Sequence, residues 1–239
     1  MISALVYGAK GRMGQMLIAL ADERFELSQQ IDFDSSAKQL AEAISGVDLV
    51  IDFSNAAAFD ALLSALHSQP RALVSGTTAL SAAQHQAMQS LSAKVPVLWA
   101  SNMSRGVAVL HRLVAQAAAQ LADWDVEIVE THHRNKVDAP SGTALTLARA
   151  VADTRPNSKV VCGRVGDAAR QDNEIGVQAL RGGSVAGYHE VSLFAGGEQL
   201  TLSHRAESRE QFARGALDAA AWLHAKPAGL YRLDQVLGL

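Results

Sequence analysis

Residues 2–21 read Ile2-Ser-Ala-Leu-Val-Tyr7-Gly8-Ala-Lys-Gly11-Arg-Met-Gly14-Gln15-Met-Leu-Ile-Ala-Leu-Ala21, and this stretch decides the fold of the first half of the chain. Residues 2–7 have the apolar composition of a short strand, and residues 15–21 carry apolar side chains at helical spacing. The glycines between them form a tight turn that lets backbone N–H groups at a helix N-terminus approach a pyrophosphate. The stretch therefore predicts a dinucleotide-binding strand, turn and helix.

The glycine spacing departs from the usual G-x-G-x-x-G fingerprint, whose first glycine would fall at Ala9 instead of Gly8. Support comes from residues 26–32, a second strand-like run that ends in Asp32, 18 residues beyond Gly14. This is close to the offset at which a carboxylate accepts the ribose hydroxyls of NAD. A structural glycine turn without a ligand is the alternative.

The residue after Asp32 bears on the choice of cofactor. Phe33 stands where an enzyme that prefers NADP would profit from an arginine, and no cation lies within two residues of the pair. We therefore expect NADH as the preferred cofactor, with NADPH as the second candidate. The alternative is that Phe33 only packs on the adenine or the core, while Lys38 or Arg12 reaches the 2′-phosphate.

Strand and helix patterns alternate as far as residue 100, as a parallel sheet with crossover helices requires. Two loops at the ends of expected strands, Gly76-Thr77-Thr78 and Ala100-Ser101-Asn102-Met103, offer bare backbone and polar side chains. Ligands bind at these strand ends in open parallel sheets. A turn followed by a helix cap at Ser81 is the alternative for the first loop. The expected strands are 47–53, 71–75 and 95–100, and the expected helices are 56–66 and 81–91.

Beyond Asn102 a long helix over 107–121 is followed by strand-like runs in succession, which predict a mixed or antiparallel sheet. A last helix over 209–224 is expected to return to the first half. We therefore predict an α/β protein with a Rossmann-type parallel sheet domain (1–103 and 207–239) and a smaller α+β domain with a mixed sheet (104–206). The strand-like runs are 126–130, 177–181, 190–194 and 199–204.

Composition excludes several classes of protein. The net charge is −3 and the basic residues are scattered, so nothing supplies the positive surface that nucleic-acid binding needs. Cys162 is the only cysteine, which excludes an internal disulfide and fits the reducing cytoplasm. No apolar run approaches the roughly 18 residues of a membrane span, and the N-terminus lacks a basic export signal. We expect a cytoplasmic protein without a membrane or nucleic-acid partner.

The most specific segment is Glu130-Thr-His132-His133-Arg-Asn-Lys136-Val-Asp-Ala-Pro-Ser-Gly142-Thr143-Ala144. Two imidazoles follow a strand, and adjacent side chains on a strand diverge. The unpaired N–H groups of a helix starting near Gly142 and Thr143, with Lys136, predict an anion site beside a group that moves a proton. Surface histidines are the alternative; a metal is not expected, because no cysteine or second acid cluster completes a coordination shell.

These motifs resemble the 4-hydroxy-tetrahydrodipicolinate reductase family, also called dihydrodipicolinate reductase, of bacterial lysine and diaminopimelate synthesis. The match continues to Gly229-Leu-Tyr231 and Val236-Leu237, and the histidine segment is its specific part. The resemblance implies an NAD(P)H-dependent reductase of a small dicarboxylate, with a second domain for substrate binding and assembly of a homotetramer. A different nicotinamide-linked dehydrogenase and a non-catalytic dinucleotide sensor are the rival functions.

The resemblance also implies roles for individual residues. His132 would be the proton donor and Lys136 a second catalytic group, while His133, Gly142 and Thr143 would bind a substrate carboxylate. Many members carry an acid followed by arginine where this chain has Asp32-Phe33, and the segment between Asp32 and Val47 looks short. The residues expected at the cofactor are Gly8, Ala9, Lys10, Gly11, Arg12, Met13, Asp32, Phe33, Gly76, Thr77, Thr78, Ala100, Ser101, Asn102 and Met103.

Overall fold

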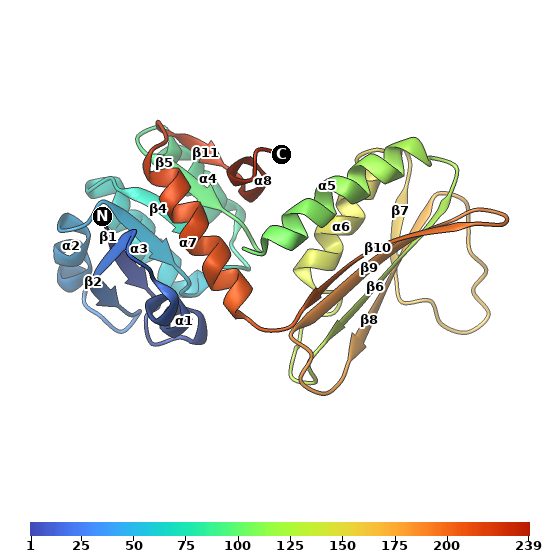
Figure 1. Cartoon of the computed structure of the whole chain (residues 1–239), viewed down its shortest axis with the longest axis horizontal. Coiled ribbons are helices and arrows are strands. Elements are labelled where there is room, and N and C mark those ends of the chain that lie inside the picture. The colour runs from blue at the N-terminus through green and yellow to red at the C-terminus, as the bar shows by residue number, and fades with distance from the viewer. The chain divides into compact units, whose positions relative to one another are not determined.

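The computed structural model describes residues 1–239 and divides into two compact units (Figure 1). Unit 1 contains Met1–Arg105 and Glu210–Leu239, and unit 2 contains Gly106–Arg209. From the sequence we expected the chain to pass from the first domain to the second near Met103 and to return near Glu207. The chain therefore leaves unit 1 after about a hundred residues and returns to it for its last helices.

Unit 1 is built on a six-stranded sheet in the order β11-β5-β4-β3-β1-β2, in which all neighbouring strands are parallel. The chain moves outward from β1 to β2 and then crosses to the other side of β1, so the switch in direction lies between β1 and β3. Such switch points are where open parallel sheets bind ligands. The strands are β1 Ile2–Tyr7, β2 Phe25–Ile31, β3 Leu49–Asp52, β4 Ala72–Ser75, β5 Pro96–Trp99 and β11 Gly229–Tyr231.

Helices cover both faces of this sheet, which confirms the Rossmann-type architecture. Helices α1 and α7 contact each other, while α2, α3 and α4 form the other layer around buried Phe59 and Leu62. None of the helices has the length and apolar character needed to cross a membrane. The helices are α1 Arg12–Leu20, α2 Ala37–Ser45, α3 Ala56–Ser68, α4 Ala82–Ser92, α7 Glu210–His224 and α8 Leu233–Val236.

Helix α2 occupies the segment after Asp32 that looked short. Ser36 caps it by accepting a hydrogen bond from the Gln39 N–H, and the Gln39 side chain bonds back to the Ser36 backbone. This capping box satisfies two backbone donors that a helix start otherwise leaves unpaired. The helix then buries Leu40 and Ile44, so the segment folds as a complete crossover helix.

Unit 2 contains a five-stranded sheet in the order β10-β9-β6-β8-β7. Strands β6, β7 and β8 run parallel, and β9 is antiparallel to both β6 and β10, which confirms the predicted mixed sheet. Helices α5 (Arg105–Gln120) and α6 (Gly142–Ala152) cover one face and share a core with it (Figure 1). The strands are β6 Asp125–His132, β7 Lys159–Cys162, β8 Glu174–Arg181, β9 Gly187–Phe194 and β10 Gln199–Ala206.

The other face of the unit 2 sheet carries charged side chains. The Glu127 carboxylate on β6 pairs with Arg170 at 2.5 Å and with Arg164 at 3.5 Å, and Arg164 also pairs with Glu174 at 3.0 Å. A Cβ on Gly176 would lie 1.9 Å from the Glu127 carboxylate, so glycine leaves the room for it. These ion pairs hold the loop between β7 and β8 on the sheet.

Candidate functional site

The glycine loop of unit 1 fits a pyrophosphate. Gly8 has φ +88°, and a Cβ on it would lie 2.6 Å from the Phe53 carbonyl oxygen. A Cβ on Gly14 would lie 2.2 Å from the Gly8 carbonyl oxygen. Gly11 is the N-cap of α1 and offers no side-chain cap to the first N–H groups of that helix. The loop is therefore a backbone cradle that leaves helix N–H groups for an anion.

Asp32 lies directly after β2 and holds the glycine loop. One carboxylate oxygen accepts from the Lys10 N–H at 2.7 Å and the other accepts from the Phe33 N–H at 2.8 Å. Each carboxylate oxygen accepts about two hydrogen bonds, so both retain capacity for ribose hydroxyls. Phe33 is 64% exposed, which excludes the alternative that it packs into the core. Lys10 pairs at its ammonium with Asp34 at 2.5 Å.

A buried carboxyl at the end of β3 joins the neighbouring loops. Asp52 accepts hydrogen bonds from the Ser54 hydroxyl at 2.6 Å and the Ser75 hydroxyl at 2.7 Å. Burial raises the pKa of Asp52, and these hydrogen bonds oppose that rise. No role was predicted for Asp52 from the sequence, although an acid at the end of an apolar strand was a usable signal.

The two polar loops expected at the cofactor lie at the same edge of the sheet. A Cβ on Gly76 would lie 2.3 Å from the Phe53 ring, so the loops after β3 and β4 touch. The Ala100 N–H donates to the Ser75 carbonyl at 3.1 Å, and the Trp99 indole donates to the Thr77 carbonyl at 2.9 Å. The cap at Ser81 is present as well, since its hydroxyl accepts from the Gln84 N–H. Met103 is 1% exposed and so lies in the core.

His132 is the last residue of β6, and its ring bonds to a buried carboxylate. Its Nδ1 lies 2.5 Å from Oε2 of Glu130, which is two residues earlier and therefore on the same face of the strand. Glu130 is 0% exposed and receives a two-pronged ion pair from Arg181 on β8, at 2.8 and 2.9 Å. The sequence singled out His132 but not the Glu130–Arg181 pair behind it.

Burial and charge set the protonation of this pair. Burial works to raise the pKa of Glu130, but hydrogen bonds from Arg181, His132 and the Ser141 N–H outweigh it and hold that pKa below its usual value. Burial lowers the pKa of His132, and the neighbouring Glu130 only partly offsets the effect. At neutral pH the free protein therefore pairs a carboxylate with a mostly neutral imidazole.

The elements predicted to bind an anion lie near this histidine in unit 2, because the Ser141 N–H donates to the same Glu130 carboxylate at 3.0 Å. Helix α6 begins at Gly142, and its cap is Ser141, whose hydroxyl accepts a hydrogen bond from the Ala144 N–H. On the loop before the helix, the Asp138 carboxylate pairs with the Lys136 ammonium at 2.8 Å. A Cβ on Gly142 would meet no atom within 4 Å, so the helix N-terminus is open there.

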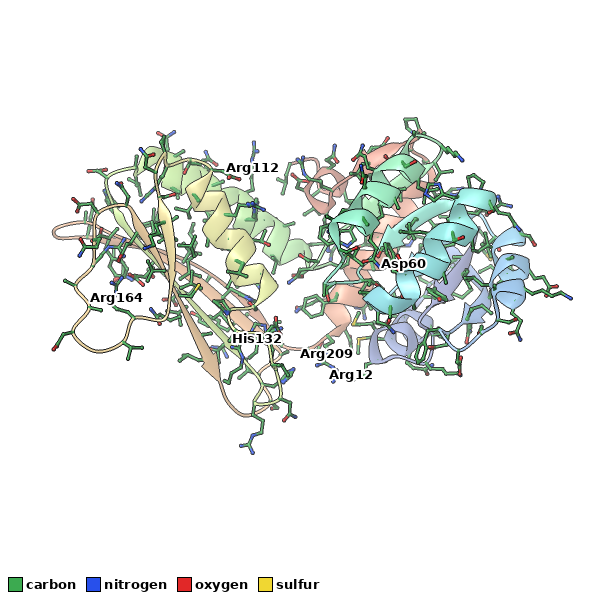
Figure 2. All side chains as sticks on the ribbon, turned by 180° about the vertical axis from the view of Figure 1, so that it is seen from behind. Arg12, Asp60, Arg112, His132, Arg164 and Arg209 are labelled. Carbon is green, nitrogen blue, oxygen red and sulfur yellow. The ribbon has the colours of Figure 1, made fainter.

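The two adjacent histidines diverge, as expected from the strand pattern. His133 Nε2 lies 3.5 Å from the Arg209 guanidinium, whereas His132 contacts Glu130. Figure 2 shows His132 and Arg209 at one end of unit 2. The structure brings together no group of three or more His, Cys, Asp or Glu side chains suited to a metal ion.

A third histidine, absent from our sequence analysis, lies behind this site. His189 on β9 is 3% exposed, and its ring packs edge-on against His132 with centroids 5.1 Å apart. Its Nε2 lies 3.2 Å from the Ser141 hydroxyl. Burial, with a smaller contribution from His132, lowers the pKa of His189 to about 4.

We expect His189 to make the protein less stable in acid. The pKa of His189 is about 4 in the folded protein and roughly 6.5 in the unfolded chain. Its contribution to the free energy of unfolding is therefore complete above pH ~6.5 and is lost as the pH falls toward 4. At 1.36 kcal/mol per unit the loss is about 3 kcal/mol. Urea unfolding at pH 7 and pH 4.5 should show a smaller acid loss for His189→Gln than for the wild type. The exposed His224→Gln is the control, and equal losses in all three would contradict the prediction.

The two units together define a class of protein: a nicotinamide-dependent oxidoreductase with a Rossmann-type unit and a second α+β unit. Residues 2–103 match the family model "Dihydrodipicolinate reductase, N-terminus", and residues 106–237 match "Dihydrodipicolinate reductase, C-terminus". The chain belongs to the dihydrodipicolinate reductase family, whose members are NAD(P)H-dependent oxidoreductases.

Individual relatives agree with this family. The 4-hydroxy-tetrahydrodipicolinate reductase of Wolinella succinogenes is 44% identical, with 98% of each chain covered. The enzyme of the same name from Zymomonas mobilis is 46% identical over 97% of this chain and 95% of its own. The dipicolinate-bound dihydrodipicolinate reductase from Paenisporosarcina sp. TG-14 superposes with a TM-score of 0.77 at 22% identity, covering 97% of each chain. This last likeness confirms the fold.

Proposed function

We propose that the protein is a 4-hydroxy-tetrahydrodipicolinate reductase that forms tetrahydrodipicolinate for diaminopimelate and lysine synthesis. The observation that carries the proposal is His132, held by buried Glu130 beside the open N-terminus of α6. A group that gives up a proton next to an anion site is what the reduction of a dicarboxylate needs. A dehydrogenase of another substrate would share the glycine loop but would have no need of this arrangement.

The chemistry divides between the two units. The 4-hydroxyl of the precursor leaves as water, which gives a cyclic imine conjugated with a carbon–carbon double bond. When bound, the nicotinamide would supply a hydride to an electron-poor ring carbon of this imine. The ring is left as an enamine-like anion, and protonated His132 gives it the Nε2 proton. Solvent then restores the proton on His132, so each substrate consumes one NAD(P)H and one proton.

We propose that the substrate carboxylates bind to unit 2. Lys136 supplies a full charge, His133 a ring donor, and Gly142 and Thr143 the N–H groups of the first turn of α6. Asp138 pairs with Lys136 at 2.8 Å in the free protein and keeps its ammonium on this loop. The relative that was crystallised with dipicolinate supports a small dicarboxylate as the ligand.

We propose that the dinucleotide binds to unit 1. Its pyrophosphate would lie on the glycine cradle from Gly8 to Met13, and its adenosine ribose would bond to Asp32 beside Phe33. The loops Gly76–Thr78 and Ala100–Met103 would receive the nicotinamide end, with the buried Met103 side chain holding the second loop on the core. Two observations support this placement of the dinucleotide: the glycine loop forms a backbone cradle, and the two polar loops lie at the same edge of the unit 1 sheet.

The preference for NADH over NADPH is part of the proposal. An exposed Phe33 beside the Asp32 carboxylate offers a 2′-phosphate no cation, so Phe33→Arg should raise the NADPH-to-NADH ratio of kcat/KM by about tenfold or more. Steady-state kinetics with each cofactor measures this ratio. Phe33→Leu is the matched control because it alters shape without adding charge, and an unchanged ratio in Phe33→Arg would refute the assignment.

The activity itself is tested by following NADH and NADPH absorbance with freshly prepared 4-hydroxy-tetrahydrodipicolinate. Turnover identifies the reductase. Turnover only with amino-acid or sugar substrates would indicate another dehydrogenase, and cofactor binding without any turnover would indicate a sensor. The same NADH and NADPH titrations give the strength of the cofactor preference.

We also propose a homotetramer located in the cytoplasm, where a reducing environment keeps Cys162 a free thiol. The face of the unit 2 sheet opposite α5 and α6 supports self-association, because Leu180 and Phe194 are exposed on it at 53% and 36%. Sedimentation of the wild type and of Leu180→Asp tests the assembly. A monomeric wild type would refute it.

A further inference from the structure

The Glu130 carboxylate has no free acceptor position. Oε1 accepts from Arg181 Nη2 at 2.8 Å and from the Ser141 N–H at 3.0 Å. Oε2 accepts from Arg181 Nη1 at 2.9 Å and lies 2.5 Å from His132 Nδ1. Four contacts fill the roughly four lone-pair positions of a carboxylate. The group is thus held on three sides by β8, α6 and its own strand.

The chemistry of these contacts fixes the hydrogen on His132. An ionised carboxylate only accepts hydrogen bonds, so Nδ1 must be the nitrogen that carries a hydrogen in the His132–Glu130 bond. The remaining nitrogen, Nε2, is then the one that gains and loses the titrating proton. A Cβ on Gly187 of β9 would lie 3.2 Å from Nε2, so glycine at this position keeps side-chain bulk away from it.

We propose that Glu130 is a positioning residue of the reductase, which anchors His132 through Nδ1 and presents Nε2 as the atom that protonates the substrate. The inference rests on the proposed function for the identity of the reaction. It assigns to Glu130 and Arg181 a part in the reaction that the sequence motif alone did not give them. A carboxylate that holds an imidazole also stabilises its protonated form.

The charged groups around His132 act in opposite directions. Glu130 favours the protonated ring, while Lys136 on the following loop and Arg181 on β8 disfavour it. His189 on β9 is neutral above pH ~4 and contributes burial. Asp138 offsets part of the Lys136 charge through their ion pair. Glu130 is therefore the main group that keeps the pKa of His132 from falling further.

Ser141 links this pair to the proposed anion site. Its N–H bonds to Glu130, while its hydroxyl caps α6 and contacts His189. The proton donor and the helix N-terminus are thus positioned by one residue. A negative charge bound at that N-terminus would favour the protonated form of His132. Substrate binding would therefore help to protonate the ring that donates the proton.

The test compares Glu130→Gln with Glu127→Gln, a matched control. Both glutamates lie on β6 and pair with arginine, but Glu127 lies on the opposite face of the sheet. Glu130→Gln should move the alkaline limb of the kcat/KM profile to lower pH by about one to two units. At pH 8 activity should fall by about 10- to 100-fold with little change in the KM for NADH. An unmoved limb would overturn the proposal, since a merely structural role would not shift it.

Nitrogen-15 NMR of the histidine rings gives a readout that needs no turnover. In the wild type at pH 7.5, His132 should carry its hydrogen on Nδ1, and its pKa should fall in Glu130→Gln but not in Glu127→Gln. A hydrogen on Nε2 in the neutral wild-type ring would overturn the proposal even if the variant did not fold. If Glu130→Gln is unfolded, the position of the hydrogen on the wild-type His132 ring decides the test by itself. A wild type with the expected NMR result but no reductase activity would refute only the proposed function.

Discussion

Replacing His132 by glutamine should lower kcat for the reduction by about 100- to 10,000-fold, the usual contribution of a positioned general acid. Glutamine reaches Glu130 with its amide and retains the packing of a polar side chain, but it has no proton that titrates near neutral pH. The KM values for substrate and cofactor should stay within a few-fold. Steady-state kinetics at saturating cofactor, with protein of verified folding, measures the loss.

The control for His132→Gln is His224→Gln, which removes an imidazole from the exposed last turn of α7. Its kcat should match that of the wild type. NADH binding, followed by fluorescence, should be the same in both variants because His132 belongs to unit 2. A His132→Gln enzyme that turns over at the wild-type rate would show that another group, or water, delivers the proton.

Local patterns predicted most of the fold, because most elements of unit 1 carry their own signals. The glycine loop, the apolar strands and the helix cap at Ser81 need only neighbouring residues. Helix α2 had a signal too, the Ser36–Gln39 capping box, which our sequence analysis did not use. Strand β7 had almost none, since its four residues are largely exposed and gain order only by pairing with β8.

Only part of the candidate site could be predicted from local sequence patterns. His132, Lys136 and Gly142 lie within one short segment, so their spacing alone indicated an anion site with a proton donor. Arg181 and His189 join that site only through strand register, because β8 places Arg181 opposite His132 and β9 places His189 opposite Glu130. Pairings over some 50 residues leave no local periodicity to detect.

Replacing Gly14 by alanine should destabilise unit 1 by about 3 kcal/mol or more and weaken NADH binding at least tenfold. The added Cβ would lie 2.2 Å from the Gly8 carbonyl oxygen and 2.7 Å from the Ala9 Cα, and both are backbone atoms that no side-chain rotation can move. Overpacking of this kind costs typically about 1–3 kcal/mol, and more where the backbone cannot yield. Gly8 cannot yield easily, since it has φ +88° and already lies against the Phe53 carbonyl.

Relief of the clash would have to open the turn between β1 and α1, and that movement would spread the N–H groups that form the cradle. Stability and cofactor affinity should therefore fall together, as urea unfolding and NADH fluorescence titration can measure. Gly46→Ala is the matched control: its Cβ would approach no atom closer than 3.9 Å, so we expect a change within about 0.5 kcal/mol and unaltered NADH binding. A Gly14→Ala protein as stable as Gly46→Ala would mean that the loop can relax, and the close packing of α1 on β1 would then not be what shapes the cradle.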